Sequence, residues 1–125
     1  MKQMGRTYHH GDLKDAVLET AQRMVEEDGV AAVSIRKIAK EVGVSHQAPY
    51  RHFRSREHIV EALRARGFIA LAEAAQEARL KHPKSTRLQL ESAGLAYVAQ
   101  AVQSPELYKL MFGATRALHE LDEEH

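Results

Sequence analysis

The segment from Ser34 to Phe53 limits the fold of this 125-residue chain more strongly than any other part of the sequence. Ser34 is a favoured residue for starting a helix, and Gly43 is a favoured residue for ending one. A short polar stretch follows the glycine, and we expect a further helix from Ser45 to Phe53. Between Ser34 and Gly43 the apolar side chains recur at helical spacing: Ile35, Ile38, Ala39 and Val42. Two short helices joined by a glycine turn predict a helix-turn-helix.

The rest of the sequence also favours helices, and no stretch alternates apolar and polar residues in the way that predicts a strand. We therefore predict an all-α fold. A three-helix helix-turn-helix domain is expected over residues 1–55, and a long connecting helix followed by the start of a partial helical regulatory domain over residues 56–125. The helices expected outside the helix-turn-helix are Leu13–Asp28, Ser55–Leu80, Ser85–Gln103 and one opened by Ser104 and Pro105.

These helices carry further expectations about their ends and buried faces. Asp12 is expected to cap the first helix with its carboxylate, and Gly29 to end it in a left-handed conformation. Gly67 is expected to be a weak point of the long helix. The side chains expected to face inward are Ile59, Leu63, Ala70, Leu71, Ala74 and Ala78, then Leu88, Leu95, Val98, Ala99 and Val102, and last Leu107, Tyr108, Met111, Phe112, Leu118 and Leu121.

Pro49 falls inside the polar helix expected from Ser45. A proline within a helix removes one backbone donor and clashes with the carbonyl four residues earlier. With Ser45 as the cap, Pro49 is the fourth helical residue and the clash falls on the cap itself. We therefore expect a helix with a loosened first turn, with Val44 and Pro49 as a candidate apolar pair under it.

Composition excludes several classes of protein. The chain has no cysteine, so disulfides and thiolate metal sites are excluded. No apolar run approaches the roughly 20 residues that a membrane span needs, and the N-terminus lacks the apolar core of a secretory signal. The net charge is only +1, but basic residues exceed acidic ones in residues 1–66 and not in residues 67–125. This asymmetry mildly favours an anionic partner for the first half.

The polar stretch after Gly43 has the chemistry of a surface that meets nucleic acid. Its side chains are hydrogen-bond donors and acceptors, and no carboxylate lies among them: Ser45, His46, Gln47, Tyr50, Arg51 and His52. A helix with this composition is too polar for a protein core. Such groups suit phosphates and the edges of bases.

The pattern GVSHQAPYRHFRSREHI, together with the helix before it, resembles the N-terminal domain of the TetR family of bacterial regulators over about residues 6–66. The positions that match are Gly43, Val44, Ser45, Tyr50, His52, Phe53 and Arg56, with arginine at position 56 where lysine is commoner. Pro49 departs from the bulky apolar residue usual there. The later stretch YVAQAVQSPELYKLMFG resembles the subset with a WHG-type C-terminal domain, and the chain resembles a truncated member.

The resemblance implies roles for particular residues. The base-reading side chains would be Arg36, His46, Gln47 and Arg51. The phosphate ligands would be Ser34, Ser45, Tyr50, His52 and Arg56, with Arg6 and Tyr8 touching the DNA backbone from the N-terminal arm. A candidate effector pocket would include Tyr97, Tyr108, Met111 and Phe112, although such residues are more often plain core.

The resemblance also implies partners and a mode of action. The chain would be a cytoplasmic, sequence-specific transcription regulator of double-stranded DNA, a repressor released by a small-molecule effector. The complete protein would be a homodimer on a palindromic operator. No cofactor is expected. The alternative is a helical protein–protein interaction module that does not bind DNA.

Metal binding and catalysis are both disfavoured by the spacing of the candidate residues. His9 and His10 are adjacent, and His46, His52 and His58 are each six positions apart. Neither arrangement places two imidazoles on one helix face, as spacing by four would. No pattern sets a nucleophile beside a base, and no glycine-rich phosphate loop is present. We therefore expect neither a metal site nor an enzyme.

Overall fold

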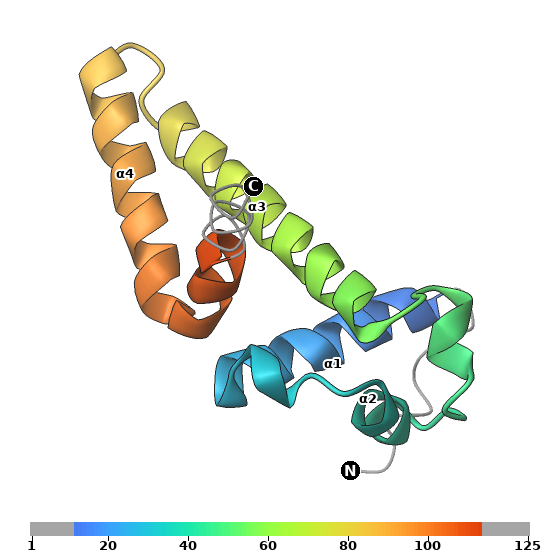
Figure 1. Cartoon of the computed structure of the whole chain (residues 1–125). Helices are drawn as coiled ribbons and strands as arrows, with labels where there is room; N and C mark the ends of the chain where they lie inside the picture. The colour runs from blue at the N-terminus through green and yellow to red at the C-terminus, as the bar shows by residue number, and fades with distance from the viewer. Residues whose placement is uncertain (1–11, 114–125) are drawn as a thin grey trace, which may run out of the picture. The chain divides into compact units, whose positions relative to one another are not determined.

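The computed structural model describes residues 12–113, and within them the chain is all helical, which confirms the expected fold class (Figure 1). The elements are α1 (Leu13–Asp28), η3 (Val30–Ala32), α2 (Ile35–Val42), η4 (Ala48–Arg51), α3 (Arg56–Leu80) and α4 (Thr86–Gln103), where η denotes a 3₁₀ helix. Residues 105–113 are also helical. None of the helices in the described part of the chain is long and apolar enough to cross a membrane.

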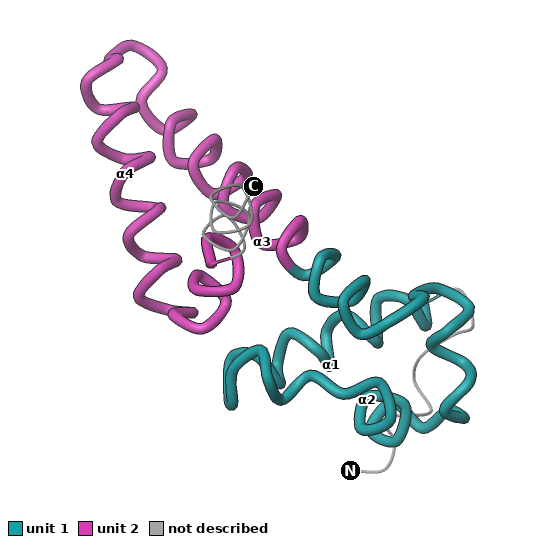
Figure 2. The backbone as a smooth tube through the Cα atoms, in the orientation of Figure 1, with its two compact units in different colours: residues 1–63 teal, residues 64–125 magenta. Residues whose placement is uncertain are grey.

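The chain forms two compact units, Met1–Leu63 and Arg64–His125, hereafter unit 1 and unit 2 (Figure 2). The division falls inside α3, whereas the sequence suggested a boundary at residue 55. The first turns of α3 belong to unit 1 because Ile59 and Leu63 are 0% and 1% exposed. Burying two such side chains contributes roughly 1.5–3 kcal/mol each, so these turns are part of the first core.

The first two expected helices have the predicted bounds, but the ends of α1 differ in detail. Asp12 precedes α1, yet its carboxylate caps no backbone N–H. Its backbone is not extended, with φ −100° and ψ 4°, and an extended backbone is what normally aims a capping side chain at the first turn. Gly29 ends α1 at φ 87° and ψ 170°, a positive φ outside the left-handed helical region that we predicted.

The ends of α2 match the sequence expectation. The Ser34 hydroxyl accepts a hydrogen bond from the Lys37 backbone N–H at 3.3 Å. Gly43 ends the helix in the left-handed region, at φ 89° and ψ 34°, a conformation that costs glycine little. On the buried side of α2, Ile38, Ala39 and Val42 contribute to the core of unit 1, while Ile35 is only half-buried.

The core of unit 1 gathers side chains from α1, α2, η4 and the first turns of α3. The largest side chains that are fully buried all lie there: Phe53, Ile38, Ile59, Leu63, Val17, Val25 and Pro49. The ring of Phe53 meets the His58 imidazole edge-on, with 5.4 Å between the ring centroids. This core fixes the face from which the polar residues of the helix-turn-helix project.

Unit 2 is built around residues 105–113, which contact both of its long helices. Met111 approaches Gly67 and Phe112 meets Phe68 on α3, while Tyr108 meets Tyr97 on α4. Ser104 precedes this segment, with its carbonyl accepting from the Tyr108 N–H at 3.0 Å. The described residues expected to be inward here are buried (Leu107, Met111) or half-buried (Tyr108, Phe112), whereas Leu118 and Leu121 lie outside the described residues.

The inward face predicted for α4 is wrong. Leu88, Leu95, Val98 and Val102 are 42%, 71%, 54% and 75% exposed, and Ala99 is exposed as well. Helical spacing put these residues on one face, but no described segment of unit 2 covers that face. Ala70 of α3 is likewise exposed, whereas Leu71, Ala74 and Ala78 are half-buried. Periodicity identifies a shared face and cannot tell whether anything packs on it.

Gly67 is a point of close approach and not a weak point of α3. A Cβ atom built there would lie 2.7 Å from the Met111 sulfur and 2.9 Å from its Cγ. Those distances are too short for non-bonded atoms, and Cγ cannot move away without moving the whole side chain. Glycine at this position therefore lets residues 105–113 pack closely against α3.

We predict that Gly67→Ala destabilises the protein, although alanine is normally favoured by roughly 0.5–1 kcal/mol in a helix interior. Combined with Met111→Ala, the same change is expected to become stabilising, with a coupling of about 0.5–3 kcal/mol in a double-mutant cycle followed by urea unfolding. Gly94→Ala is the control, because a Cβ at Gly94 meets no atom within 4 Å. Equal stabilisation by both glycine replacements would contradict the close-approach assignment.

Candidate nucleic-acid interface

The polar helix expected from Ser45 is shorter and tighter than predicted. A turn at residues 46–47 leads into a 3₁₀ helix, η4, of four residues. The Ala48 N–H donates to Ser45 O and the Tyr50 N–H to Gln47 O, both at 3.1 Å, and the His52 N–H donates to Pro49 O at 3.0 Å. These bonds join residues three apart, which is the 3₁₀ pattern.

Pro49 explains why the α-helix does not form. An α-helix starting at Ser45 would need the residue at position 49 to donate to Ser45 O, and proline has no N–H. The Ser45 carbonyl is instead taken by Ala48, one residue earlier. Ala48 and Pro49 face the core, at 7% and below 2% exposure. Pro49 thus sets the helix type and anchors the segment, while Val44 remains half-buried.

All four candidate base readers are exposed, but only two of them line a common hollow. Arg36 and His46 line one open hollow of about 520 Å³, whose full lining is Arg36, Ala39, Lys40, Val44, Ser45 and His46. Gln47 and Arg51 do not line it; they are exposed on the turn before η4 and at its end. The structure therefore brings Arg36 and His46 to one hollow and does not place Gln47 or Arg51 in its lining.

Lys40 is a further basic side chain of this hollow that was not among the candidate site residues. It lies one helical turn after Arg36, so the two side chains share a face of α2. That spacing is visible in the sequence and could have identified it. Glu41, the nearby carboxylate, is paired with Arg23 of α1 at 2.8 Å. This hydrogen bond is the main cause that raises the pKa of Arg23 above its usual value. It also pairs the negative charge of Glu41, which would otherwise repel phosphate.

The candidate phosphate ligands fall into two groups. Ser45, Tyr50 and His52 are exposed, with 48% of Tyr50 accessible. Ser34 is half-buried, and its hydroxyl oxygen already caps α2, although the hydroxyl hydrogen can still be donated. Arg6 and Tyr8 lie outside the described residues.

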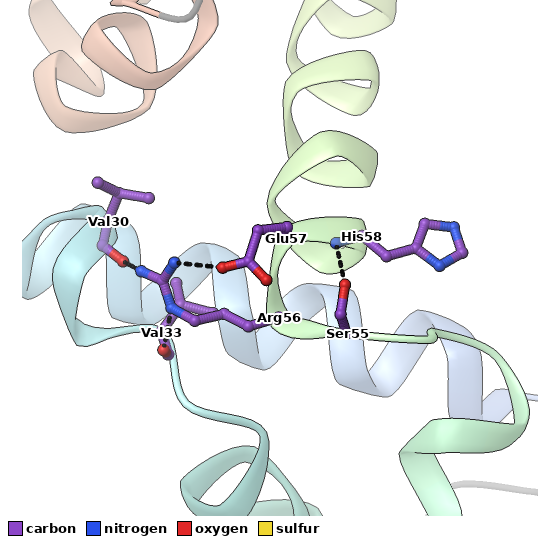
Figure 3. A network of polar contacts seen from close by, with 6 residues as sticks. All are labelled: Val30, Val33, Ser55, Arg56, Glu57 and His58. Carbon is purple, nitrogen blue, oxygen red and sulfur yellow. Dashed lines mark hydrogen bonds and ion pairs between the residues drawn. The ribbon is translucent and has the colours of Figure 1, made fainter.

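Arg56 differs from the expected phosphate ligand because its guanidinium is bonded within the protein (Figure 3). Its Nε donates to Val33 O at 2.8 Å and its Nη2 donates to Val30 O. Its Nη1 lies 3.5 Å from the Glu57 carboxylate. The resemblance suggested that Arg56 contacts a DNA phosphate. The two carbonyls that accept hydrogen bonds from its guanidinium are more than twenty residues away in sequence.

The candidate effector pocket is nearly filled by its own side chains. Its free volume is about 10 Å³, enough for about one water molecule, and its lining is Leu71, Tyr97, Gln100, Ala101, Ser104, Leu107, Tyr108 and Met111. Three of the four predicted residues line it, and Phe112 packs beside it with its ring 4.7 Å from that of Tyr108. The Tyr97 and Tyr108 hydroxyls are 2.6 Å apart, and this hydrogen bond raises the pKa of Tyr97.

An amphipathic helix, a left-handed glycine turn and an exposed polar 3₁₀ segment define unit 1 as a helix-turn-helix domain. Residues 17–63 match the model of the bacterial regulatory proteins of the tetR family. Over these residues, the chain carries a DNA-binding domain of the TetR type.

Relatives of the chain agree with this assignment. It is 32% identical over 105 residues to the nucleoid occlusion factor SlmA of two Aliivibrio fischeri strains, MJ11 and ATCC 700601 / ES114, covering 80% of this chain and 51% of each relative. A solved structure of a protein with unknown function from Rhodococcus sp. RHA1 matches with a TM-score of 0.77 and 39% identity, over 86% of this chain and 56% of that one. The chain spans about half the length of the curated relatives it matches.

Proposed function

We propose that this chain is a sequence-specific DNA-binding transcription regulator. The observation that carries the proposal is the polar face of unit 1, where Arg36, Lys40 and His46 line one hollow and no free carboxylate is among its lining residues. The positive side chains of Arg36 and Lys40 can neutralise phosphates, and the Arg36 and His46 side chains can form hydrogen bonds with base edges. The related proteins support a role on bacterial DNA, which lies in the cytoplasm.

Within this proposal, Arg36, His46, Gln47 and Arg51 read bases, while Ser34, Ser45, Tyr50 and His52 hold phosphates, assisted by Lys40. Gln suits adenine and Arg suits guanine, because each forms paired hydrogen bonds with those bases. The exposure of all but the half-buried Ser34 supports these roles. Arg56 is left out, since its guanidinium is engaged by Val30 and Val33.

Regulation is proposed to be repression released by a small apolar or amphipathic molecule held near Tyr97 and Tyr108. The free volume there is too small for such a ligand, so binding requires the Tyr97–Tyr108 contact to open. We further propose that the protein acts as a homodimer on a palindromic site. The four base readers of one copy contact few base pairs, and two-fold pairing doubles the number that are read.

The proposal predicts that the full chain binds random-sequence duplex DNA at low salt and loses affinity steeply as salt rises. Each phosphate neutralised contributes about −0.9 to the slope of log K against log salt. Lys40→Ala should reduce the magnitude of that slope by about 0.9, because one neutralised phosphate is lost. Fluorescence anisotropy across a salt series measures the slope.

Lys84→Ala is the matched control, because Lys84 is an exposed lysine in unit 2, away from the helix-turn-helix. Its slope should equal that of the wild-type chain. Absence of binding at low salt, or binding that ignores salt, would support the alternative of a protein-interaction module and overturn the proposed function.

A further inference from the structure

The ends of the helix-turn-helix segment are joined by a single side chain. Arg56 is the first residue of α3, and its guanidinium bonds to the carbonyls of Val30 in η3 and Val33 just before α2 (Figure 3). Nη1 faces the Glu57 carboxylate, so each of the three guanidinium nitrogens has a partner in the protein. The side chain is 36% exposed, and its donors point into unit 1.

This contact suits arginine and not lysine. A guanidinium presents several N–H donors in a rigid plane and can bond to two carbonyls at once, whereas an ammonium group is a point charge on a flexible stem. The Val30 carbonyl also accepts from the Val33 N–H at 3.2 Å, the bond that ends η3. Arg56 therefore reinforces the turn that delivers the chain into α2.

The hydrogen bonds of Arg56 span the whole helix-turn-helix segment. Everything between Val33 and Arg56 is the helix-turn-helix itself: α2, the turn at Gly43 and η4. The backbone connects Val33 to Arg56 through this segment, and the hydrogen bonds of the Arg56 guanidinium connect the two ends of the segment directly. Val33 and Ile59 are 2% and 0% exposed, so the backbone at both ends of this segment is anchored in the core.

We propose that Arg56 is a positioning residue for DNA recognition, which fixes the start of α2 against the first turn of α3 and so sets where Arg36 and Lys40 stand relative to η4. The proposal rests on the proposed DNA-binding function. It assigns Arg56 a role through Val30 and Val33 in place of a phosphate contact.

A positioning residue and a phosphate ligand predict different behaviour. Removing a phosphate ligand weakens binding to all sequences and lowers the salt slope by about 0.9, and lysine should substitute well. Removing a positioning residue misplaces the base-reading side chains, so it lowers the preference for the selected site and leaves the salt slope on random DNA unchanged. Lysine should then fail to rescue, because it cannot hold both carbonyls.

The test compares Arg56→Lys and Arg56→Ala with the wild-type full chain. A site selected from random DNA by the wild-type protein serves as the specific probe, and random duplex as the non-specific probe. In both variants the affinity ratio between the two probes should fall by about tenfold, the loss expected for a charge-assisted hydrogen bond. Arg54→Ala removes a nearby exposed arginine as the charge control and should keep the ratio.

A second measurement needs no DNA. Amide hydrogen exchange at the start of α2, residues 35–38, should be faster in both Arg56 variants than in the wild-type chain, with the core amides of α1 unchanged. Wild-type protein that binds no DNA would overturn the proposed function, and hydrogen exchange would still decide whether the contact exists in solution.

Three results would overturn the proposal. The first is a salt slope reduced by about 0.9 in Arg56→Ala together with wild-type affinity in Arg56→Lys, the behaviour of a phosphate ligand. The second is unchanged exchange at the start of α2 in both variants. The third is complete loss of the folded state in both variants, which would make Arg56 a requirement for folding and not for positioning.

Discussion

Replacing Phe53 by alanine is expected to unfold unit 1 or leave it barely folded. Phe53 is 1% exposed and is the largest of the fully buried side chains of that core. Loss of a buried phenylalanine costs about 3–5 kcal/mol, through lost burial and the cavity left behind. A domain of this size has a stability near the lower end of about 5–15 kcal/mol, so little remains. Urea unfolding followed by circular dichroism measures the change.

Phe68→Ala is the control for this prediction. Phe68 is also an aromatic residue, with an edge-on contact to Phe112, but it is 41% exposed and lies in unit 2. Its replacement should cost clearly less, and it should leave DNA binding intact. A loss below about 1 kcal/mol for Phe53→Ala would be typical of a surface position and would contradict the core described for unit 1.

Gln47→Ala and Arg51→Ala are each expected to weaken binding to the selected site by about 1–3 kcal/mol, the usual value of a good contact to a base edge. Both side chains are exposed and lie within two residues of the buried pair Ala48 and Pro49, which holds the segment in place. Binding to random duplex should change far less for Gln47→Ala, because a neutral side chain contributes little to phosphate neutralisation. Repeating the site selection with each variant shows at which position of the DNA site the base preference is lost.

Tyr50→Phe serves as the contrasting variant, since loss of a hydroxyl donated to phosphate should weaken all sequences by a similar factor. Gln103→Ala and Arg87→Ala, at exposed positions of unit 2, control for general effects of the substitutions. Should Tyr50→Phe change the selected sequence while Gln47→Ala and Arg51→Ala leave it unchanged, the base-reading and phosphate roles of residues 47–51 would have to be exchanged.

The sequence predicted the first two helices to the residue, and three of their four ends are marked by local chemistry. Gly29 and Gly43 take positive φ values that favour glycine, and Ser34 caps α2 with its own hydroxyl. These effects act within a few residues, so they can be read without knowledge of the fold. The all-helical class follows from the same spacing of apolar residues, which holds along the chain.

The features that the sequence did not predict depend on distant contacts or on competition between two helix types. Pro49 was expected to loosen one turn of an α-helix, but removal of the donor to Ser45 O favoured the 3₁₀ pattern instead. Arg56 was assigned to phosphate because its charge is visible, whereas the carbonyls of Val30 and Val33 are brought near it only by the fold. The exposed face of α4 has the spacing of a buried one.

The brevity of η4 limits how much of a genome the chain can distinguish. This 3₁₀ helix of four residues offers one turn of side chains, and α2 and the turn add only three more base readers, so a single copy inspects only a few base pairs. A sequence that short recurs by chance at very many of the roughly 10⁶–10⁹ competing positions on genomic DNA. One copy would therefore spend nearly all its time at accidental matches. Binding at a single genomic site therefore requires two or more recognition segments to bind together. The fixed spacing between them is one that chance matches rarely reproduce.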